Sequence, residues 1–187
     1  MEGTLNIYPP SEDTFLLEKT IPKIKRDLAI DVGTGSGYLA FFLSEFVKYV
    51  IATDIEKNAV KYALNISKKK KVHNVDFVVT NLFDSFRNDI FDLVVFNPPY
   101  LPYNGISTEI DIQTIFNLKN RNIIIEFLSK LKNILKRNGE CYIVLSSLSP
   151  VNEIINFIEA QGLKQEKVSS KRFFFEEIFV LKLSYSP

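Results

Sequence analysis

The sequence is poor in the residues that build disulfide scaffolds, thiolate zinc sites and histidine-based catalysis. Its 187 residues include one cysteine, Cys141, and one histidine, His73. A single thiol excludes a disulfide within the chain and a zinc site made of its cysteines alone. We therefore predict no metal site. We interpret Cys141 as a buried core thiol, because no histidine is near it in sequence, and we assign no role to His73.

An excess of charge of one sign and long apolar segments are lacking too. The chain has 23 Lys and Arg against 22 Asp and Glu, so its net charge of +1 gives no general basic surface for nucleic acid. No segment has the roughly 20 apolar residues that cross a bilayer, and the N-terminus has no apolar signal core. We expect a cytoplasmic protein, with residues 1–187 in one domain.

Apolar strands alternate with amphipathic helices, and this alternation predicts a doubly wound α/β fold with right-handed crossovers. The predicted strands are 28–32, 49–54, 75–80, 91–96, 141–145, 163–169 and 174–183. The predicted helices are 12–20, 38–46, 57–70, 121–135 and 151–160. We also expect Gly139 to form the turn before the fifth strand, the last two strands to join near Ser170-Lys171, and the run Phe173-Phe174-Phe175 to lie in the core.

The loop Gly33-Thr34-Gly35-Ser36-Gly37 follows the first strand and opens a helix, as in nucleotide-binding units. Its third glycine, Gly37, comes one residue too early for a dinucleotide fingerprint, and the loop lacks the lysine of a P-loop. Asp31 at the strand end would repel a pyrophosphate but suits a cationic ligand. S-adenosylmethionine fits, since its sulfonium and amino groups are cationic. A tight turn without a ligand remains the alternative.

Two further polar residues follow predicted strands. Asp54 ends the second strand, where an acid accepts hydrogen bonds from ribose hydroxyls in such units, although it could also cap the next helix. Asn81 follows the third strand, where an amide can contact the adenine edge, although an ordinary turn would also use asparagine. Both are candidate cofactor ligands.

The buried fourth strand stops at Asn97-Pro98-Pro99-Tyr100. Proline fixes φ, lacks an N–H and keeps the preceding residue extended, so this segment forms a stiff corner. Asn97 and the Pro98 carbonyl could both accept hydrogen bonds from one planar NH₂ group, and Tyr100 could pack on it. The first and fourth strands should flank the point where strand order reverses, which places this corner beside the glycine loop. All four residues are candidate catalytic residues, and Asn97 also borders the cofactor.

Near the N-terminus, Ser11 is a plausible N-cap, and Glu12-Asp13-Thr14 reads on physical grounds as helix capping. However, Tyr8, Pro10 and the run Glu12-Asp13-Thr14-Phe15-Leu16-Leu17, taken with Asn-Pro-Pro-Tyr at 97–100, resemble the HemK/PrmC class of S-adenosylmethionine-dependent methyltransferases, in its archaeal and eukaryotic branch. The resemblance implies a class I fold, with a seven-stranded, mainly parallel sheet and helices on both faces. It also implies that segment 1–22 contributes to the cofactor site through Thr14.

The resemblance further implies methylation of a glutamine side-chain amide, in the Gly-Gly-Gln motif of a class-1 peptide chain release factor. Relatives in eukaryotes work with a small zinc-binding activator that covers an apolar edge of the sheet, so we expect a similar partner. Two features depart from the family: Asn81 stands where aspartate is usual, and residues 105–125 lack a glycine-rich segment. Methylation of an adenine exocyclic amine in RNA or DNA, methylation of a protein lysine, and a non-enzymatic cofactor-binding scaffold remain alternatives.

Overall fold

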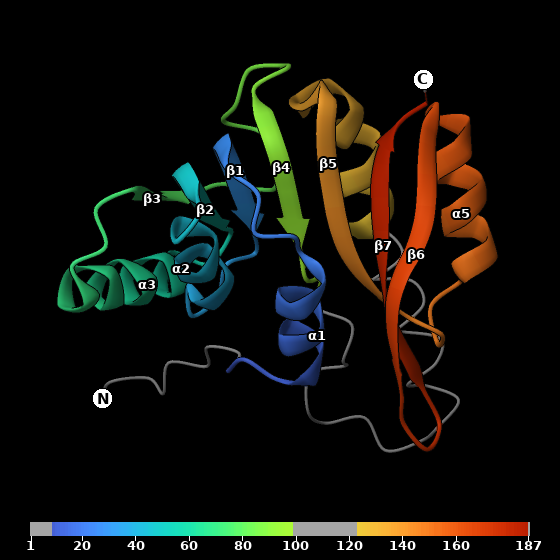
Figure 1. Cartoon of the computed structure of the whole chain (residues 1–187), viewed down its shortest axis with the longest axis horizontal. Coiled ribbons are helices and arrows are strands. Elements are labelled where there is room, and N and C mark those ends of the chain that lie inside the picture. Colours follow the sequence, from blue (N-terminus) through green and yellow to red (C-terminus); the bar gives the residue numbers. More distant parts are fainter. Residues whose placement is uncertain (1–8, 99–122, 187) are drawn as a thin grey trace.

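A computed structural model of the chain describes residues 9–98 and 123–186 (Figure 1). Its sheet has seven strands: β1 (Arg26–Val32), β2 (Val47–Asp54), β3 (Val75–Val79), β4 (Phe91–Phe96), β5 (Leu135–Ser146), β6 (Leu163–Arg172) and β7 (Glu177–Tyr185). Its helices include α1 (Glu12–Thr20), α2 (Tyr38–Ser44), α3 (Lys57–Lys70) and α5 (Val151–Ala160). Residues 123–134 form a further helical segment before β5. The predicted α/β fold is confirmed.

The strand order is β3-β2-β1-β4-β5-β7-β6. β7 runs antiparallel to both of its neighbours, β5 and β6, and the other neighbouring pairs are parallel. The chain builds outward from β1 in one direction and then returns to lay β4 on the other side of β1. The order therefore reverses between β1 and β4, as the sequence predicted. In open parallel sheets the crevice beyond the carboxyl ends of such strands is where ligands bind.

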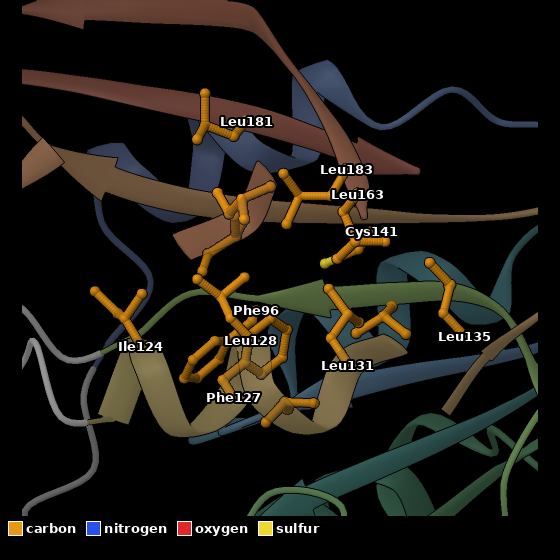
Figure 2. Packing of buried hydrophobic residues seen from close by; sticks show 14 of the residues in the cluster. Phe96, Ile124, Phe127, Leu128, Leu131, Leu135, Cys141, Leu163, Leu181 and Leu183 are labelled. Carbon is orange, nitrogen blue, oxygen red and sulfur yellow. The ribbon is translucent and has the colours of Figure 1, made fainter. Parts of the chain in front are cut away.

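Two apolar clusters hold the sheet between helices. Leu17 of α1 and Leu39 and Leu43 of α2 pack on one face. The helical segment 123–134 and α5 cover the other, where residues such as Phe127, Leu131 and Ile154 are less than 1% exposed. Figure 2 shows this second cluster, with Phe96 at the end of β4 packed above Phe127. The strand ends that carry polar side chains are thus fixed from both faces.

The fifth strand differs from its prediction. β5 begins at Leu135, six residues before Cys141, and Gly139 lies inside it. The register explains the difference, because Phe91 pairs with Leu135 but Leu93 pairs with Glu140, so the intervening β5 residues bulge out. A Cβ at Gly139 would lie 2.9 Å from the Phe91 carbonyl oxygen, which is why glycine stands there.

The last hairpin also corrects two predictions. β6 continues to Arg172, beyond the predicted junction at Ser170-Lys171, because a bulge between Lys167 and Ser169 shifts its pairing with β7. The chain turns at residues 173–176 instead. Phe174 and Phe175 are 101% and 93% exposed, so the prediction that Phe173–175 lie in the core is wrong. Hydrophobicity alone could not reveal that this run forms the tip of a hairpin.

No helix within residues 9–98 and 123–186 is long and apolar enough to cross a bilayer.

Candidate active site

The glycine loop turns sharply between β1 and α2. Gly33, Gly35 and Gly37 have φ values of 66°, 52° and 84°, all in the left-handed region. Gly37 is the N-cap of α2, and a Cβ there would come within 2.9 Å of the Phe41 ring. Glycine is thus required both by backbone conformation and by space. The loop lies directly beyond the carboxyl end of β1, the strand that pairs with β4.

Asp31 lies under this loop and is 1% exposed. Its Oδ2 accepts a hydrogen bond from the Thr34 hydroxyl at 2.7 Å. Burial raises the pKa of Asp31 from 3.8 to about 7, partly offset by hydrogen bonds, while the nearby charge of Asp54 adds a smaller increase. A carboxylate that is costly to ionise in the free protein is stabilised by a cation placed next to it.

Asp54, at the end of β2, ties the loop to the neighbouring strand. One oxygen accepts from the Gly35 N–H and the other from the Glu56 N–H, both at 2.9 Å. The second bond precedes α3, so the capping alternative describes a real contact. Each carboxylate oxygen can accept a further hydrogen bond, so these contacts leave capacity for ribose hydroxyls.

Asn81 follows β3 and contacts the helical segment 123–134. Its Nδ2 donates to Glu126 Oε1 at 3.0 Å. Glu126 also accepts from Lys130 at 2.7 Å, and Lys130 reaches Asp84 at 2.6 Å. These two carboxylates raise the pKa of Lys130. Because Glu126 holds the NH₂ side of the Asn81 amide, the carbonyl side is the one that can accept from an adenine amine, as the family's aspartate would.

Asn97, one residue beyond β4, is held by the first turn of α1. Its Nδ2 donates to Asp13 Oδ2 at 3.1 Å and to Thr14 Oγ1 at 3.2 Å. Asp13 is 2% exposed, and its Oδ1 accepts from the Thr14 N–H and the Ser11 hydroxyl, both at 2.6 Å. Carboxylate oxygens accept hydrogen bonds, so the NH₂ side of the Asn97 amide must face Asp13.

The opposite side of this amide faces no hydrogen-bond donor of the described residues. Asn97 Oδ1 is buried and has no hydrogen-bond partner among the described residues. A buried amide oxygen without a donor costs free energy, about 1–3 kcal/mol, unless a ligand supplies the donor. The arrangement is thus an oriented acceptor whose donor is none of the described residues.

The residue before Asn97 is part of a stacked aromatic pair. Phe96, 1% exposed, stacks on Phe127 with ring centroids 4.5 Å apart (Figure 2). A Cβ at Gly33 would lie 3.6 Å from the same Phe96 ring, so the glycine loop passes directly over it. The glycine loop and Asn97 therefore both lie next to the Phe96 ring, although they are far apart in sequence.

The predicted site residues that the structure describes lie at one end of the sheet. Four polar residues lie at or just beyond the carboxyl ends of the adjacent strands β1, β2, β3 and β4, namely Asp31, Asp54, Asn81 and Asn97. Thr14 joins them through its contact with Asn97. Pro98 is buried, whereas Pro99 and Tyr100 lie outside the described residues. The described residues contain no group of three or more His, Cys, Asp or Glu side chains arranged to hold a metal.

Sequence reasoning missed two residues that orient the site, Asp13 and Glu126. Asp13 was read together with Ser11 and Thr14 as a helix cap, and that role is real, since the Ser11 N–H contacts Thr14 Oγ1 at 3.4 Å. The signal that could have found Asp13 was the motif Glu-Asp-Thr shared with relatives. Helix capping needs only one polar side chain, so three in a row point to a further role. Glu126 carried no signal, because it contacts Asn81 across 45 positions.

These residues fit S-adenosylmethionine without a clash of charge. Buried Asp31 suits the cationic amino and sulfonium groups, and the glycine loop provides close backbone approach. Asp54 suits the ribose hydroxyls, and the oriented Asn81 suits the adenine edge. Asn97 follows β4, next to these residues, with an acceptor that no described residue satisfies.

Comparisons with known proteins point the same way. The model of the methyltransferase small domain family matches residues 12–173. A putative protein N5-glutamine methyltransferase of Methanocaldococcus jannaschii is 32% identical, over 94% of this chain and 90% of its own. The methyltransferase HEMK2 of Homo sapiens is 28% identical, over 97% of this chain and 91% of its own.

Among solved structures, the E. cuniculi Mtq2-Trm112 complex, responsible for methylation of the translation termination factor eRF1, superposes with a TM-score of 0.73. The alignment covers 96% of this chain and 99% of the solved chain at 21% identity, so it establishes a shared fold. The matched family model spans the glycine loop, Asn97 and most of the sheet. The chain therefore belongs to the methyltransferase small domain family.

Proposed function

We propose that this methyltransferase transfers the methyl group of S-adenosylmethionine to the side-chain amide nitrogen of a glutamine, in the Gly-Gly-Gln motif of a class-1 release factor. The names of the relatives support this substrate: one is a putative protein N5-glutamine methyltransferase, and another forms a complex responsible for methylation of eRF1. Translation termination takes place in the cytoplasm, and we propose that the chain works there.

One observation carries the proposal. The NH₂ side of Asn97 is held by Asp13 and Thr14, and its buried Oδ1 has no partner among the described residues. The group that fits this acceptor is a planar NH₂, which a glutamine amide supplies. An aliphatic alcohol or a thiol offers a single donor, whereas an amide can donate one hydrogen to Asn97 and the other to a second acceptor. We propose the Pro98 carbonyl as that second acceptor.

The two acceptors would act by alignment. An amide nitrogen is a poor nucleophile because its lone pair is delocalised into the carbonyl. Holding both N–H bonds fixes the nitrogen in line with the methyl group and eases it toward tetrahedral geometry, while the acceptors stabilise the positive charge that develops. The cofactor supplies a methyl group activated by a positively charged sulfur. One amide proton leaves after transfer, so no general-base histidine is needed.

We propose that eight residues line the cofactor site. Those that hold the cofactor are Thr14, Asp31, Gly33, Gly35, Gly37, Asp54 and Asn81, and Asn97 borders both the cofactor and the substrate. Pro99 and Tyr100 are proposed to complete the substrate side. We propose that residues 1–187 form one methyltransferase domain, in which segment 1–22 supports the site. The observed support is the contact of Asp13 and Thr14 with Asn97.

The test is methyl transfer from labelled cofactor to purified release factor, read by mass spectrometry of the Gly-Gly-Gln peptide. Wild-type chain should label the glutamine, and Asn97→Ala should lose activity while cofactor affinity changes little. Label on RNA or DNA adenine, or on a protein lysine, would replace the substrate in this proposal. No transfer to any of these, with cofactor still bound, would favour a non-enzymatic scaffold.

We further propose a small partner protein, as the name of the Mtq2-Trm112 complex suggests. We propose the β3 edge of the sheet as its binding surface. The two edge strands differ in chemistry: β3 reads Val-Asp-Phe-Val-Val, whereas β6 carries three lysines, one arginine and one glutamate among its ten residues. Charged edges discourage strand addition, and an apolar edge accepts it. Val79 on β3 is 48% exposed and is a candidate contact.

Co-purification tests this surface. Val79→Lys should weaken retention of the partner, and Val168→Lys, a matched change at an exposed valine of the β6 edge, should not. Equal retention by both variants would reject the β3 edge. We propose that the partner binds zinc, as the resemblance implies, and metal analysis of the co-purified protein would test that point.

A further inference from the structure

The hairpin between β6 and β7 ends in an aromatic tip, which we define as Phe173, Phe174 and Phe175. Their exposed fractions are 38%, 101% and 93%. The Phe173 N–H donates to the Glu176 carbonyl at 2.7 Å, so the chain reverses across the two most exposed residues. Such positions usually carry Gly, Asn, Asp, Pro or Ser, which stabilise the turn. Two phenylalanines there offer apolar area to another molecule.

The strand register places the tip on the active-site side of the sheet. Ile178 of β7 pairs with Ser146, the last residue of β5, and Ile143 of β5 pairs with Phe96, the residue before Asn97. The hairpin therefore extends past the carboxyl ends of β4 and β5, as Figure 1 shows. With about 3.4 Å per residue and about 4.8 Å between strands, the tip lies about 20 Å from Asn97.

Helix α1 connects the two features. Lys171, two residues before the tip, forms an ion pair with Glu12. The next residue in α1, Asp13, holds the Asn97 amide. α1 thus contacts both the hairpin and the catalytic corner.

Building on the proposed function, we propose that the aromatic tip docks the body of the release factor while its target glutamine enters the Asn97 site. A standard protein interface buries about 800 Å² on each partner, a patch about 32 Å across, which is wide enough to include both features. Aromatic side chains at the centre of such patches carry much of the binding energy. The fitting partner surface is an apolar pocket next to the loop that bears the glutamine.

The charges around the tip favour a protein over a lipid surface. Lys171 and Arg172 precede it, and Glu176 and Glu177 follow it. Lys171 is paired with Glu12, and Glu177 with Lys167 at 2.7 Å. Binding to an anionic membrane needs a cationic surplus, which this balanced rim lacks. A mixed polar rim around an apolar centre is the usual composition of a protein interface.

The experiment compares wild type, Phe174→Ala/Phe175→Ala and the control Ile24→Ala. Ile24 is 58% exposed and precedes β1, at the opposite end of the sheet. The full chain, co-expressed with the partner proposed above, is assayed for release-factor affinity by biolayer interferometry with S-adenosylhomocysteine present. Methyl-transfer kinetics follow on the same samples, and cofactor affinity checks the fold.

We expect the double variant to bind release factor about 30-fold more weakly, as for loss of a hot spot, with the kinetic loss in KM. Ile24→Ala should match wild type, and cofactor affinity should be equal in all three. Unchanged release-factor affinity in the double variant overturns the docking proposal. This holds even if the double variant loses binding to lipid vesicles or self-association, because the tip would then serve another partner. Wild type that binds release factor through the tip without methylating it overturns the proposed function alone. Wild type that does not bind release factor overturns both.

Discussion

Cofactor affinity should weaken as the pH falls below neutral, because of Asp31. This carboxyl is 1% exposed, and its burial raises its pKa to about 7 in the free protein. The cationic groups of S-adenosylmethionine favour the ionised form, so binding lowers this pKa. Binding below pH 7 must then release a proton, which costs affinity in proportion to the fraction of Asp31 that is protonated.

The magnitude follows from the pKa. With a value of about 7, half of Asp31 is ionised at pH 7 and about 3% at pH 5.5, so the dissociation constant should rise about 15-fold over this range. The amino group of the cofactor stays protonated there, since ordinary α-amino pKa values are about 7.7–8.0. Isothermal titration calorimetry at pH 5.5, 6.2 and 7.0 measures the change directly.

The Asp31→Asn variant is the control. It should bind more weakly at pH 7, with a dissociation constant that does not vary from pH 5.5 to 7. The Asp31 pKa is higher in the folded chain than its ordinary value of 3.8, so the native state holds the extra proton between about pH 4 and pH 7. Wild-type stability is therefore lost as pH rises through that window. Without cofactor, Asp31→Asn should melt at a higher temperature than wild type at pH 8. A flat wild-type affinity, or a pH-dependent variant, would refute this role.

Three further variants probe other parts of the site. Gly37→Ala should destabilise the fold by about 1–2 kcal/mol from its positive φ alone, with more from contact with Phe41; chemical denaturation measures this, and unchanged stability would contradict the loop geometry. Asp13→Ala frees the Asn97 amide and should lower kcat/KM about 10- to 100-fold, with near-normal cofactor affinity in titration calorimetry; equal loss in both would make Asp13 merely structural. Asn81→Asp places a carboxylate against Glu126 and should weaken cofactor binding roughly tenfold, whereas adding Glu126→Gln should restore it; additive losses in this cycle would reject the pairing.

The sequence predicted the sheet and the bounds of four elements, α1, α3, β4 and α5, because local chemistry determined them. β4 and α3 have the predicted bounds, and the reversal of strand order lies where the glycine loop and Asn97 required it. These are places where a buried apolar run, a left-handed turn or a pair of prolines leaves the backbone few choices. The convergence of Asp31, Asp54 and Asn97 follows from topology once the strands are known.

What could not be predicted depends on contacts between distant segments. The polar stretch before Cys141 resembles a turn, but it is a bulge within β5, which pairs with β4 on both sides of it. Glu126 orients Asn81 from a helix whose periodicity shows only its apolar face. The phenylalanines at 173–175 have the composition of a core, and their exposure comes only from the position of the turn.

The central claim is that Asn97 Oδ1 accepts a hydrogen bond from the NH₂ group of a glutamine side chain. Its most direct test is mass spectrometry of release factor isolated from cells with the wild-type chain, with Asn97→Ala and without the chain. We predict one added methyl group on the glutamine of the Gly-Gly-Gln motif with wild type alone. An unmethylated glutamine in wild-type cells, or full methylation in cells that lack the chain, would contradict the account.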